Sequence, residues 1–587
     1  MFIHPLAGVL SAYGIGLADL RTLRERSLEA PLEEAGSQVR EILNRLENEA
    51  RSDLLAQDLP FDRITVLRRV HLRYQGTDTA LVVPETGAEE LRAAFEMEHQ
   101  RRFGFLVPGR NLVVDAVSVE AVGASEAVTE TDGELYPVSV PPVEAARVSL
   151  WSGGRRYDAP VFERDLLRPG QKLRGPVLIS EANATTVVDA GWEARVDARR
   201  NLLLERLEPK GKVVAVSTRP DPVRLEIFNN IFMSIAEQMG VTLAKTAHSV
   251  NIKERLDFSC AVFDVHGSLI ANAPHIPVHL GSMGESVRRV IEANSGRLEP
   301  GDVYALNDPY HGGTHLPDIT VVTPVFDMSG GEILFYVGSR GHHADIGGIT
   351  PGSMPPRSRI LTEEGVLLDN FKLVSKGRFL EENILHLLTS GPWPARNPRQ
   401  NILDLQAQIA ANEKGVQELR KLVQHFGLDV VRAYMQHVQN NAEEAVRRVV
   451  DRLNDGAFVC RMDDGAVVQV AVRVDRQSRS TTIDFTGTSP QRETNFNAPS
   501  AVCKAAVLYV FRTLTKDEIP LNAGCLKPLN IIIPEDSMLN PKPLAAVVAG
   551  NVETSQCLAD ALYGALEVMA ASQGTMNNFT FGNARYQ

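Results

Sequence analysis

The sequence contains few cysteines, no long apolar run and no excess of positive charge. Its 5 cysteines are spread over 587 residues without CxxC spacing, which argues against a disulfide framework and favours a reducing compartment. Because no run of about 18 apolar residues occurs, no segment is expected to span a bilayer. Acidic residues outnumber basic ones by 73 to 61, which argues against nucleic acid or a membrane as the main partner.

A signal peptide and the common nucleotide-binding motifs are also missing. The N-terminus lacks the basic segment and apolar core of a signal peptide, so we expect a cytoplasmic protein. The phosphate-binding patterns GxxxxGK(S/T) and GxGxxG after a strand are both absent. The sequence therefore shows no self-contained nucleotide site.

The length points to several domains. At 587 residues the chain exceeds a single hydrophobic core, and a prior of about 150 residues per domain suggests roughly three or four. Composition separates three blocks: a Gly-rich segment at 1–28, a mixed helix and strand region at 29–210, and a longer region at 219–587 that follows the linker Thr218–Pro222. We expect a multidomain α+β fold.

Several elements can be placed from local signals. Apolar spacing predicts a helix over 32–53 and another that begins at Pro222, is capped by Asp221 and ends near Gly240. A helical region over 401–454 should break near Gly427. Alternating residues predict a strand from Phe258 to Val262 and a second one after the turn at 264–267.

The densest chemistry lies between Asn307 and Gly348. Four potential ligands or bases fall within a Gly-rich run: Asp308, His311, His315 and Asp318. A hairpin with its turn near residue 329 would place Asp318 opposite about Arg340 and Leu316 opposite about His342. His315, Asp318 and the pair His342/His343 would then meet just outside the strands.

Two imidazoles and one carboxylate form a common ligand set for Zn, Mn or Fe. The sequence therefore predicts a divalent-metal site, in which Asp308, Asp345 and the spare histidine orient ligands or act as a base. The alternative left open is that these histidines only bond the backbone of Gly-rich loops.

Three weaker candidates lie outside this cluster. Cys260 could be a nucleophile if His248 or His275 approached it, although an alternating Cys is more often a buried strand residue. Glu364, beside Glu363, could be a catalytic acid or an ordinary surface carboxylate. The run 550–553 could bind an anion at a helix N-terminus or simply start a helix.

Long motifs in the chain resemble the hydantoinase/oxoprolinase family. Those that resemble its B subunit are Glu226–Cys260 (which ends in AHSVNIKERLDFSC), Asn272–Gly284 (NAPHIPVHLGSMG) and Asn307–Gly348. The segments His4–Gly14 (HPLAGVLSAYG) and Gly175–Glu181 (GPVLISE) are similar to the end of the A subunit's nucleotide-binding domain and to its C-terminal domain. The resemblance covers essentially the whole chain.

The resemblance implies a fold and an activity. Residues 1–28 would be the tail of an actin-like ATPase domain, with Gly8, Ser11 and Gly14 near its nucleotide. Residues 29–210 would be a mixed α/β A-type domain, and 219–587 a mixed β-sheet and helix B domain without its C-terminal end. We expect ATP-dependent hydrolysis of 5-oxo-L-proline to L-glutamate, or alternatively a hydantoinase, an acetone-carboxylase relative or a non-catalytic chain.

The family also implies cofactors and partners. Its His-x-x-Asp and later His fall on His315, Asp318 and His342, which would hold Mn or Zn. Asp308, His343, Asp345 and Glu364 are the remaining catalytic candidates. ATP and Mg would be bound by an A-type segment that this chain lacks, so we expect the chain to be inactive alone, to need that segment or subunit, and to form a homo-oligomer.

Overall fold

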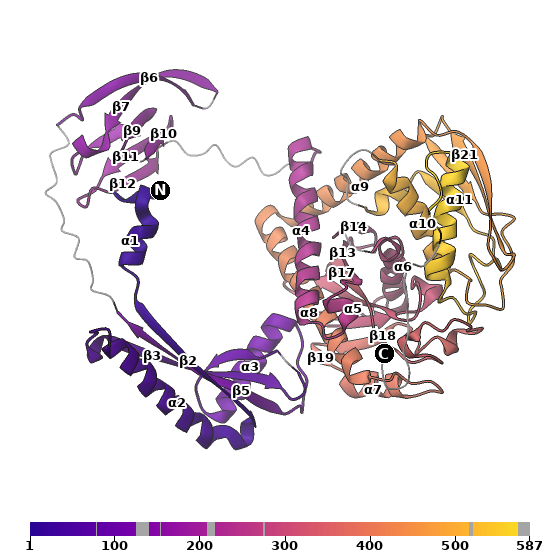
Figure 1. Ribbon diagram of the computed structural model, residues 1–587. Coiled ribbons are helices and arrows are strands. Elements are labelled where there is room, and N and C mark those ends of the chain that lie inside the picture. The colour runs from indigo at the N-terminus through magenta and orange to yellow at the C-terminus, as the bar shows by residue number, and fades with distance from the viewer. Residues whose placement is uncertain are drawn as a thin grey trace. The chain divides into compact units, whose positions relative to one another are not determined.

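The structure is a computed structural model that describes residues 1–77, 79–124, 140–152, 154–182, 184–207, 218–273, 276–515, 521–572 and 574 (Figure 1). Its contacts divide the chain into two compact units. Unit 1 comprises Met1–Leu72, Val82–Ala88 and Val113–Val216, and unit 2 comprises Arg73–Leu81, Glu89–Leu112 and Ser217–Gln587. Helices and several sheets occur together, which confirms the expected α+β class.

Unit 1 contains most of three four-stranded sheets. Their strands are β1 (Phe2–Ile3), β2 (Leu20–Pro31), β3 (Ile64–Tyr74), β4 (Leu81–Pro84), β5 (Leu112–Gly123), β6 (Glu144–Ser152), β7 (Arg155–Glu163), β8 (Lys172–Arg174), β9 (Val177–Ser180), β10 (Thr185–Val188), β11 (Trp192–Val196) and β12 (Leu202–Arg206). The sheet orders are β1-β12-β11-β8, β10-β9-β7-β6 and β2-β5-β3-β4. The helices are α1 (Leu10–Gly16) and α2 (Leu32–Leu55).

The first residues of the chain are shared between two of these sheets. Phe2 in β1 pairs with Leu203 in β12, and β2 pairs with β5. The domain boundary expected after residue 28 falls inside β2. Most of the linker expected between residues 210 and 219 lies outside the described residues. Assignment of the first segment to an actin-like domain stays a prediction.

Unit 2 is built on a seven-stranded antiparallel sheet and a smaller four-stranded one. The strands are β13 (Phe258–Phe263), β14 (Leu269–Asn272), β15 (Val303–Leu306), β16 (Asp318–Phe326), β17 (Ile333–His342), β18 (Phe371–Ser375), β19 (Arg378–Phe379), β20 (Gly456–Arg461), β21 (Val467–Asp475), β22 (Ser480–Asp484) and β23 (Leu529–Ile532). The larger sheet has the order β14-β13-β17-β16-β15-β18-β19, and the smaller β20-β21-β22-β23.

Nine helices are described in or next to these sheets: α3 (Ala88–Phe103), α4 (Pro222–Thr246), α5 (Val250–Lys253), α6 (Pro277–Ala293), α7 (Glu381–Thr389), α8 (Pro398–Phe426), α9 (Leu428–Val450), α10 (Ser500–Thr513) and α11 (Ser555–Leu566). Asp221 caps α4 by accepting a hydrogen bond from the Arg224 N–H, as predicted. The predicted end at Gly240 is wrong, because Gly240 is buried inside the helix and the buried face continues through Leu243 to the end at Thr246. The predicted break at Gly427 is confirmed.

Helices cover both faces of the seven-stranded sheet. Successive residues of β17 point to opposite faces, as in any strand. Arg340 bonds Ser282 and Ser286 of α6, whereas Ser339 donates to the Gln408 carbonyl of α8. The sheet is therefore a layer between α6 on one face and α8 on the other, and α8 in turn packs along α4 (Figure 1).

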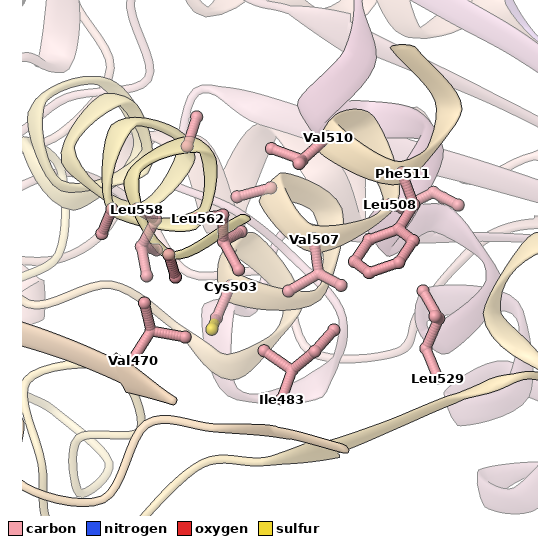
Figure 2. Packing of buried hydrophobic residues seen from close by; sticks show 14 of the residues in the cluster. Val470, Ile483, Cys503, Val507, Leu508, Val510, Phe511, Leu529, Leu558 and Leu562 are labelled. Atoms are coloured by element: carbon pink, nitrogen blue, oxygen red, sulfur yellow. The ribbon is translucent and has the colours of Figure 1, made fainter. Parts of the chain in front are cut away.

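The smaller sheet has its own apolar core. Figure 2 shows Val470 and Ile483 of this sheet facing Cys503 and Val507 of α10, with Leu558 and Leu562 of α11 beside them. α10 also contacts α6 closely, since a Cβ added at Gly281 would lie 2.3 Å from the Ala505 Cα. This contact joins the second core to the helix that covers the larger sheet. No helix in the described parts of the chain has the length and apolarity needed to cross a membrane.

Candidate metal centre

The hairpin β16–β17 carries the centre, with a register that differs from the predicted one. Asp318 pairs with His342, and Arg340 pairs with Thr320. The predicted pairing of Asp318 with about Arg340 is wrong by two residues, because the turn lies later and an irregularity occurs between Val325 and Phe326. Asp318 is thus the first residue of β16 and His342 the last of β17, rather than lying outside the strands.

Three side chains converge at this end of the hairpin. The Oδ2 atom of Asp318 lies 2.9 Å from His315 Nδ1, and its Oδ1 atom lies 3.0 Å from His342 Nδ1. One nitrogen or oxygen from each of the three residues lies within 4.8 Å of the others. The side chains of His315 and Asp318 are buried, whereas that of His342 is 16% exposed and forms the accessible side.

A tight loop brings His315 to the hairpin. Gly312 has φ 87°, and a Cβ at Gly313 would lie 2.5 Å from the Asn307 carbonyl oxygen, so both positions require glycine. Asn307 donates to the Leu316 carbonyl at 2.8 Å and accepts from the Leu368 N–H at 2.7 Å. These bonds fix the path of the backbone on both sides of His315.

Two residues that the sequence analysis did not single out complete the surroundings of Asp318. The Nε2 atom of His279 lies 3.1 Å from Asp318 Oδ2, and the Thr314 hydroxyl donates to the same oxygen at 2.6 Å. His279 Nδ1 is 3.2 Å from the Ser259 hydroxyl. His279 comes from α6 and stands in one of the family-like motifs, but only the packing of α6 on the sheet brings it here.

The centre favours an ionised carboxylate beside a neutral imidazole. Burial alone would raise the pKa of Asp318, but favourable electrostatic interactions and hydrogen bonds with His315 and His279 hold it well below its usual value. Burial lowers the pKa of His315, which favours its neutral form, and a neutral imidazole has one ring nitrogen that can bind a cation. Burial opposes the charge on His342 as well, but its bond to Asp318 outweighs this and raises its pKa.

A buried guanidinium lies on the same face. Arg340 donates to Thr320 at 2.7 Å, to Ser286 at 2.9 Å and to the Gly312 carbonyl at 2.8 Å, and also bonds Ser282. Burial lowers its pKa to about 10, while the charge of Asp318 acts in the opposite direction. Arg340 therefore remains cationic at neutral pH and balances Asp318.

His343 faces the other side of the sheet. Its Nε2 lies 3.1 Å from Gln408 Oε1, and its Nδ1 lies 3.2 Å from Asn401 Nδ2, both on α8. Burial lowers its pKa. The structure does not bring His343 to Asp318, because His342 and His343 are adjacent residues that point to opposite faces.

Asp345 and Glu364 hold loops near this hairpin. Asp345 accepts from the N–H groups of Gly347 and Gly352, both at 2.9 Å, and from the Arg396 guanidinium at 2.7 Å. Glu364, fully buried, accepts from the Ser358 hydroxyl at 2.7 Å and from the Val547 N–H at 3.0 Å. These contacts order the backbone, so a direct catalytic role for either residue stays a prediction.

Asp308 belongs to a second group of possible ligands. It accepts from the Tyr310 N–H at 2.9 Å and lies 2.6 Å from His311 Nδ1. Asp308, His311 and Asp369 also approach within 4.8 Å of one another, but His311 and Asp369 are exposed and Asp369 pairs with Arg289 at 3.0 Å. The buried centre at Asp318 is the better enclosed of the two.

The remaining candidates lie elsewhere. Gly8, Ser11 and Gly14 are exposed on and just before α1, and their nucleotide role stays a prediction. Cys260 is fully buried in β13, and burial raises its thiol pKa, which opposes the thiolate that a nucleophile needs. His275, one of its two suggested partners, is outside the described residues, and a role for the other, His248, stays a prediction. The run 550–553 lies in a π-helical turn, Gly550–Thr554, that leads into α11.

Comparisons with known proteins place these features in one family. A family model described as Hydantoinase B/oxoprolinase matches residues 221–587, and one described as Hydantoinase/oxoprolinase C-terminal domain matches residues 134–207. 5-oxoprolinase 1 of Arabidopsis thaliana is 42% identical over 613 aligned residues, which cover 99% of this chain and 48% of that protein. 5-oxoprolinase of Saccharomyces cerevisiae is 38% identical, covering 99% and 47%.

Solved structures share part of the fold. The ATP-dependent caprolactamase from Pseudomonas jessenii superposes with a TM-score of 0.53 and 27% identity, covering 59% of this chain and 60% of that one. Nucleotide-free acetone carboxylase superposes with a TM-score of 0.51 at 18% identity, covering 59% and 48%, which indicates the fold alone. The chain spans about half the length of the curated relatives it matches. With more than half of its residues matched by one family model, the chain belongs to the hydantoinase B/oxoprolinase family, as its motifs predicted.

Proposed function

We propose that this chain supplies the hydrolytic part of an ATP-dependent enzyme that opens a cyclic amide, with 5-oxo-L-proline as its substrate and L-glutamate as its product. Relatives named 5-oxoprolinase that align along 99% of the chain support this substrate. A lactam is a poor electrophile, so ATP is expected to activate it. ATP and Mg would be bound by an A-type segment, carried on a longer polypeptide or a second subunit.

We further propose that His315, Asp318 and His342 hold a divalent ion, Mn or Zn. The single observation that carries this is the convergence of two imidazole nitrogens on the two oxygens of one buried carboxylate, at 2.9 and 3.0 Å. An ionised Asp318 and a neutral His315 fit a cation in both charge and lone pairs. Such an ion would polarise a carbonyl or lower the pKa of a water.

The protein groups around the centre have separate tasks in this proposal. His279 and Thr314 fix the orientation of the Asp318 carboxylate through its Oδ2 atom. Arg340 supplies a fixed positive charge on the same face, and the charge of Asp318 raises the pKa of Arg340 in turn. His342, on the accessible side, is the residue nearest to an approaching substrate. Asp308, His343, Asp345 and Glu364 remain the candidates for a catalytic role, and they also hold loops and helices near the centre.

Metal content tests the centre. The purified chain, analysed by mass spectrometry after removal of loosely bound ions, should carry close to one Mn or Zn, and His315→Ala should lose it. The matched control is His386→Ala, which removes an exposed imidazole from α7 and should keep the metal. A folded parent without metal, or a His315→Ala variant that retains it, would contradict the centre.

Substrate and partner need a separate assay. The chain alone should not hydrolyse ATP, and a complementing A-type segment should restore turnover of 5-oxo-L-proline. Hydantoins, caprolactam, and acetone with bicarbonate are the alternatives suggested by the fold neighbours and the family. Preference for one of them would replace 5-oxo-L-proline as the substrate and leave the metal centre unchanged. A cytoplasmic location and a homo-oligomer remain part of the proposal.

A further inference from the structure

Asn551 reaches the metal centre from a distant part of the chain. It lies 236 residues after His315, in the π-helical turn Gly550–Thr554 that precedes α11. Its Nδ2 atom is 3.3 Å from His315 Nδ1. π-helical turns widen the backbone locally and are frequent at functional sites. Here the turn directs a carboxamide at the imidazole nitrogen that also faces Asp318.

The hydrogen-bond donors and acceptors around the Asn551 amide are not matched. If His315 Nδ1 carries a proton, it donates to Asp318 Oδ2 at 2.9 Å and cannot also accept from Asn551. The Asn551 Oδ1 atom is buried and has no hydrogen-bond partner among the described residues. Leaving such an oxygen unpaired costs about 1–3 kcal/mol. The oxygen and nitrogen of an amide exchange places when it rotates by half a turn.

Rotation of the amide would put Asn551 Oδ1 beside the centre. Bonds of about 2.1 Å to a metal separate neighbouring ligand atoms by about 3.0 Å in an octahedron and about 3.4 Å in a tetrahedron. The separations at the centre are 2.9, 3.0 and 3.3 Å. The position now occupied by Asn551 Nδ2 is therefore at ligand distance from His315 Nδ1.

We propose that Asn551 provides its side-chain oxygen as a fourth donor to the ion held by His315, Asp318 and His342. This inference rests on the proposed metal centre. It gives the centre two nitrogen and two or more oxygen donors, and it links the π-helical turn to the β16–β17 hairpin through the ion. The ion would thereby add a further link between the larger sheet and the smaller core of unit 2, which already touch through Gly281 and Ala505.

Metal affinity tests the role of Asn551. Metal-free full chain is titrated with MnCl₂, and free Mn²⁺ is followed by its electron paramagnetic resonance signal. Asn551→Ala should weaken Mn²⁺ binding roughly 10-fold or more, and Asn551→Asp, which keeps an oxygen donor, should bind at least as tightly as the parent. The control Gln556→Ala removes an amide from the same helix end, where it donates to Ser572, and should bind like the parent.

Thermal unfolding of each metal-free variant checks that it is folded. If Asn551→Ala does not fold, Asn551→Leu keeps the side-chain volume and replaces it in the titration. Parent-like affinity in whichever variant folds, while His315→Ala loses the metal, would overturn the role of Asn551 and leave the proposed function standing. A parent that binds no Mn²⁺ or Zn²⁺ would overturn both.

Discussion

Replacing Asp318 by Asn changes one oxygen of the buried carboxylate into an NH₂ group. Three donors surround Oδ2: the Thr314 hydroxyl at 2.6 Å, His315 Nδ1 at 2.9 Å and His279 Nε2 at 3.1 Å. The amide oxygen of the Asp318→Asn variant would face these donors, so its NH₂ would face His342 Nδ1, which lies 3.0 Å from Oδ1 in the parent. His342 could then accept that bond only as a neutral imidazole.

The cost of this change can be worked out from the contacts. Hydrogen bonds to a charged group contribute about 1.5–3 kcal/mol each, against about 0.5–1.5 kcal/mol for neutral ones. His342 would also lose its ion pair with the Asp318 carboxylate, and breaking a buried ion pair costs about 3–5 kcal/mol. Because these losses share the same contacts and do not add, we expect Asp318→Asn to lower the free energy of unfolding by about 3–5 kcal/mol without metal.

The effect should depend on pH with a definite sign. The pKa of Asp318 is depressed in the folded protein, so its stabilisation is complete above about pH 4 and is lost as the pH falls through the folded value. The pKa of His342 is raised, so its stabilisation is complete below about pH 6.5 and is lost at higher pH. The parent and the variant should therefore differ most between about pH 4 and 6.5.

Hydrogen exchange in EDTA, followed by mass spectrometry on peptides from β16 and β17, reads the local free energy of opening. Asp536→Asn is the control, since Asp536 is exposed, pairs with Lys542 at 3.0 Å and has a positive φ of 58°, which Asn tolerates. Equal exchange in Asp318→Asn and the parent at about pH 6 would refute the reasoning. A difference in exchange between Asp318→Asn and the parent that grows steadily as the pH falls below about 4 would also refute it.

Two further predictions concern residues near the centre. His343→Ala should keep the metal content of the parent but lower stability by about 1–3 kcal/mol, because it leaves the buried Gln408 Oε1 atom without its hydrogen-bond partner. Metal analysis and thermal unfolding check this, and loss of metal would contradict the placement of His343 on the α8 face. Burial raises the pKa of Glu364 to about 7. The folded state therefore keeps a proton that the unfolded state releases, and stability should fall as the pH rises from about 4.3 to 7. Glu364→Gln can still accept from Val547 and should remove this decline in denaturation curves at about pH 5 and 8; parallel changes in parent and variant would count against it.

Local patterns predicted the elements that have clear caps, turns or periodicity, and errors arose where packing decided. The cap at Asp221 and the break at Gly427 follow from backbone chemistry within a few residues. Gly240 looked like a helix end because glycine often is one, yet α4 continues through it, since the buried glycine lies within an apolar face that extends to Leu243. The hairpin register was off by two because a turn and an irregularity near Phe326 shift the pairing, and neither has a distinct sequence signal.

At the metal centre, too, local sequence patterns and tertiary packing decided different features. Sequence by itself determined that His315, Asp318 and a histidine at 342 or 343 share one end of a hairpin, because strand and turn periodicity are local properties. Only the tertiary structure decided that His342 faces Asp318 while His343 faces α8, and that His279, Arg340 and Asn551 surround the centre. Those contacts join residues from separate elements, and their distances depend on how α6, α8 and the π-helical turn pack against the sheet, which no short stretch of sequence encodes.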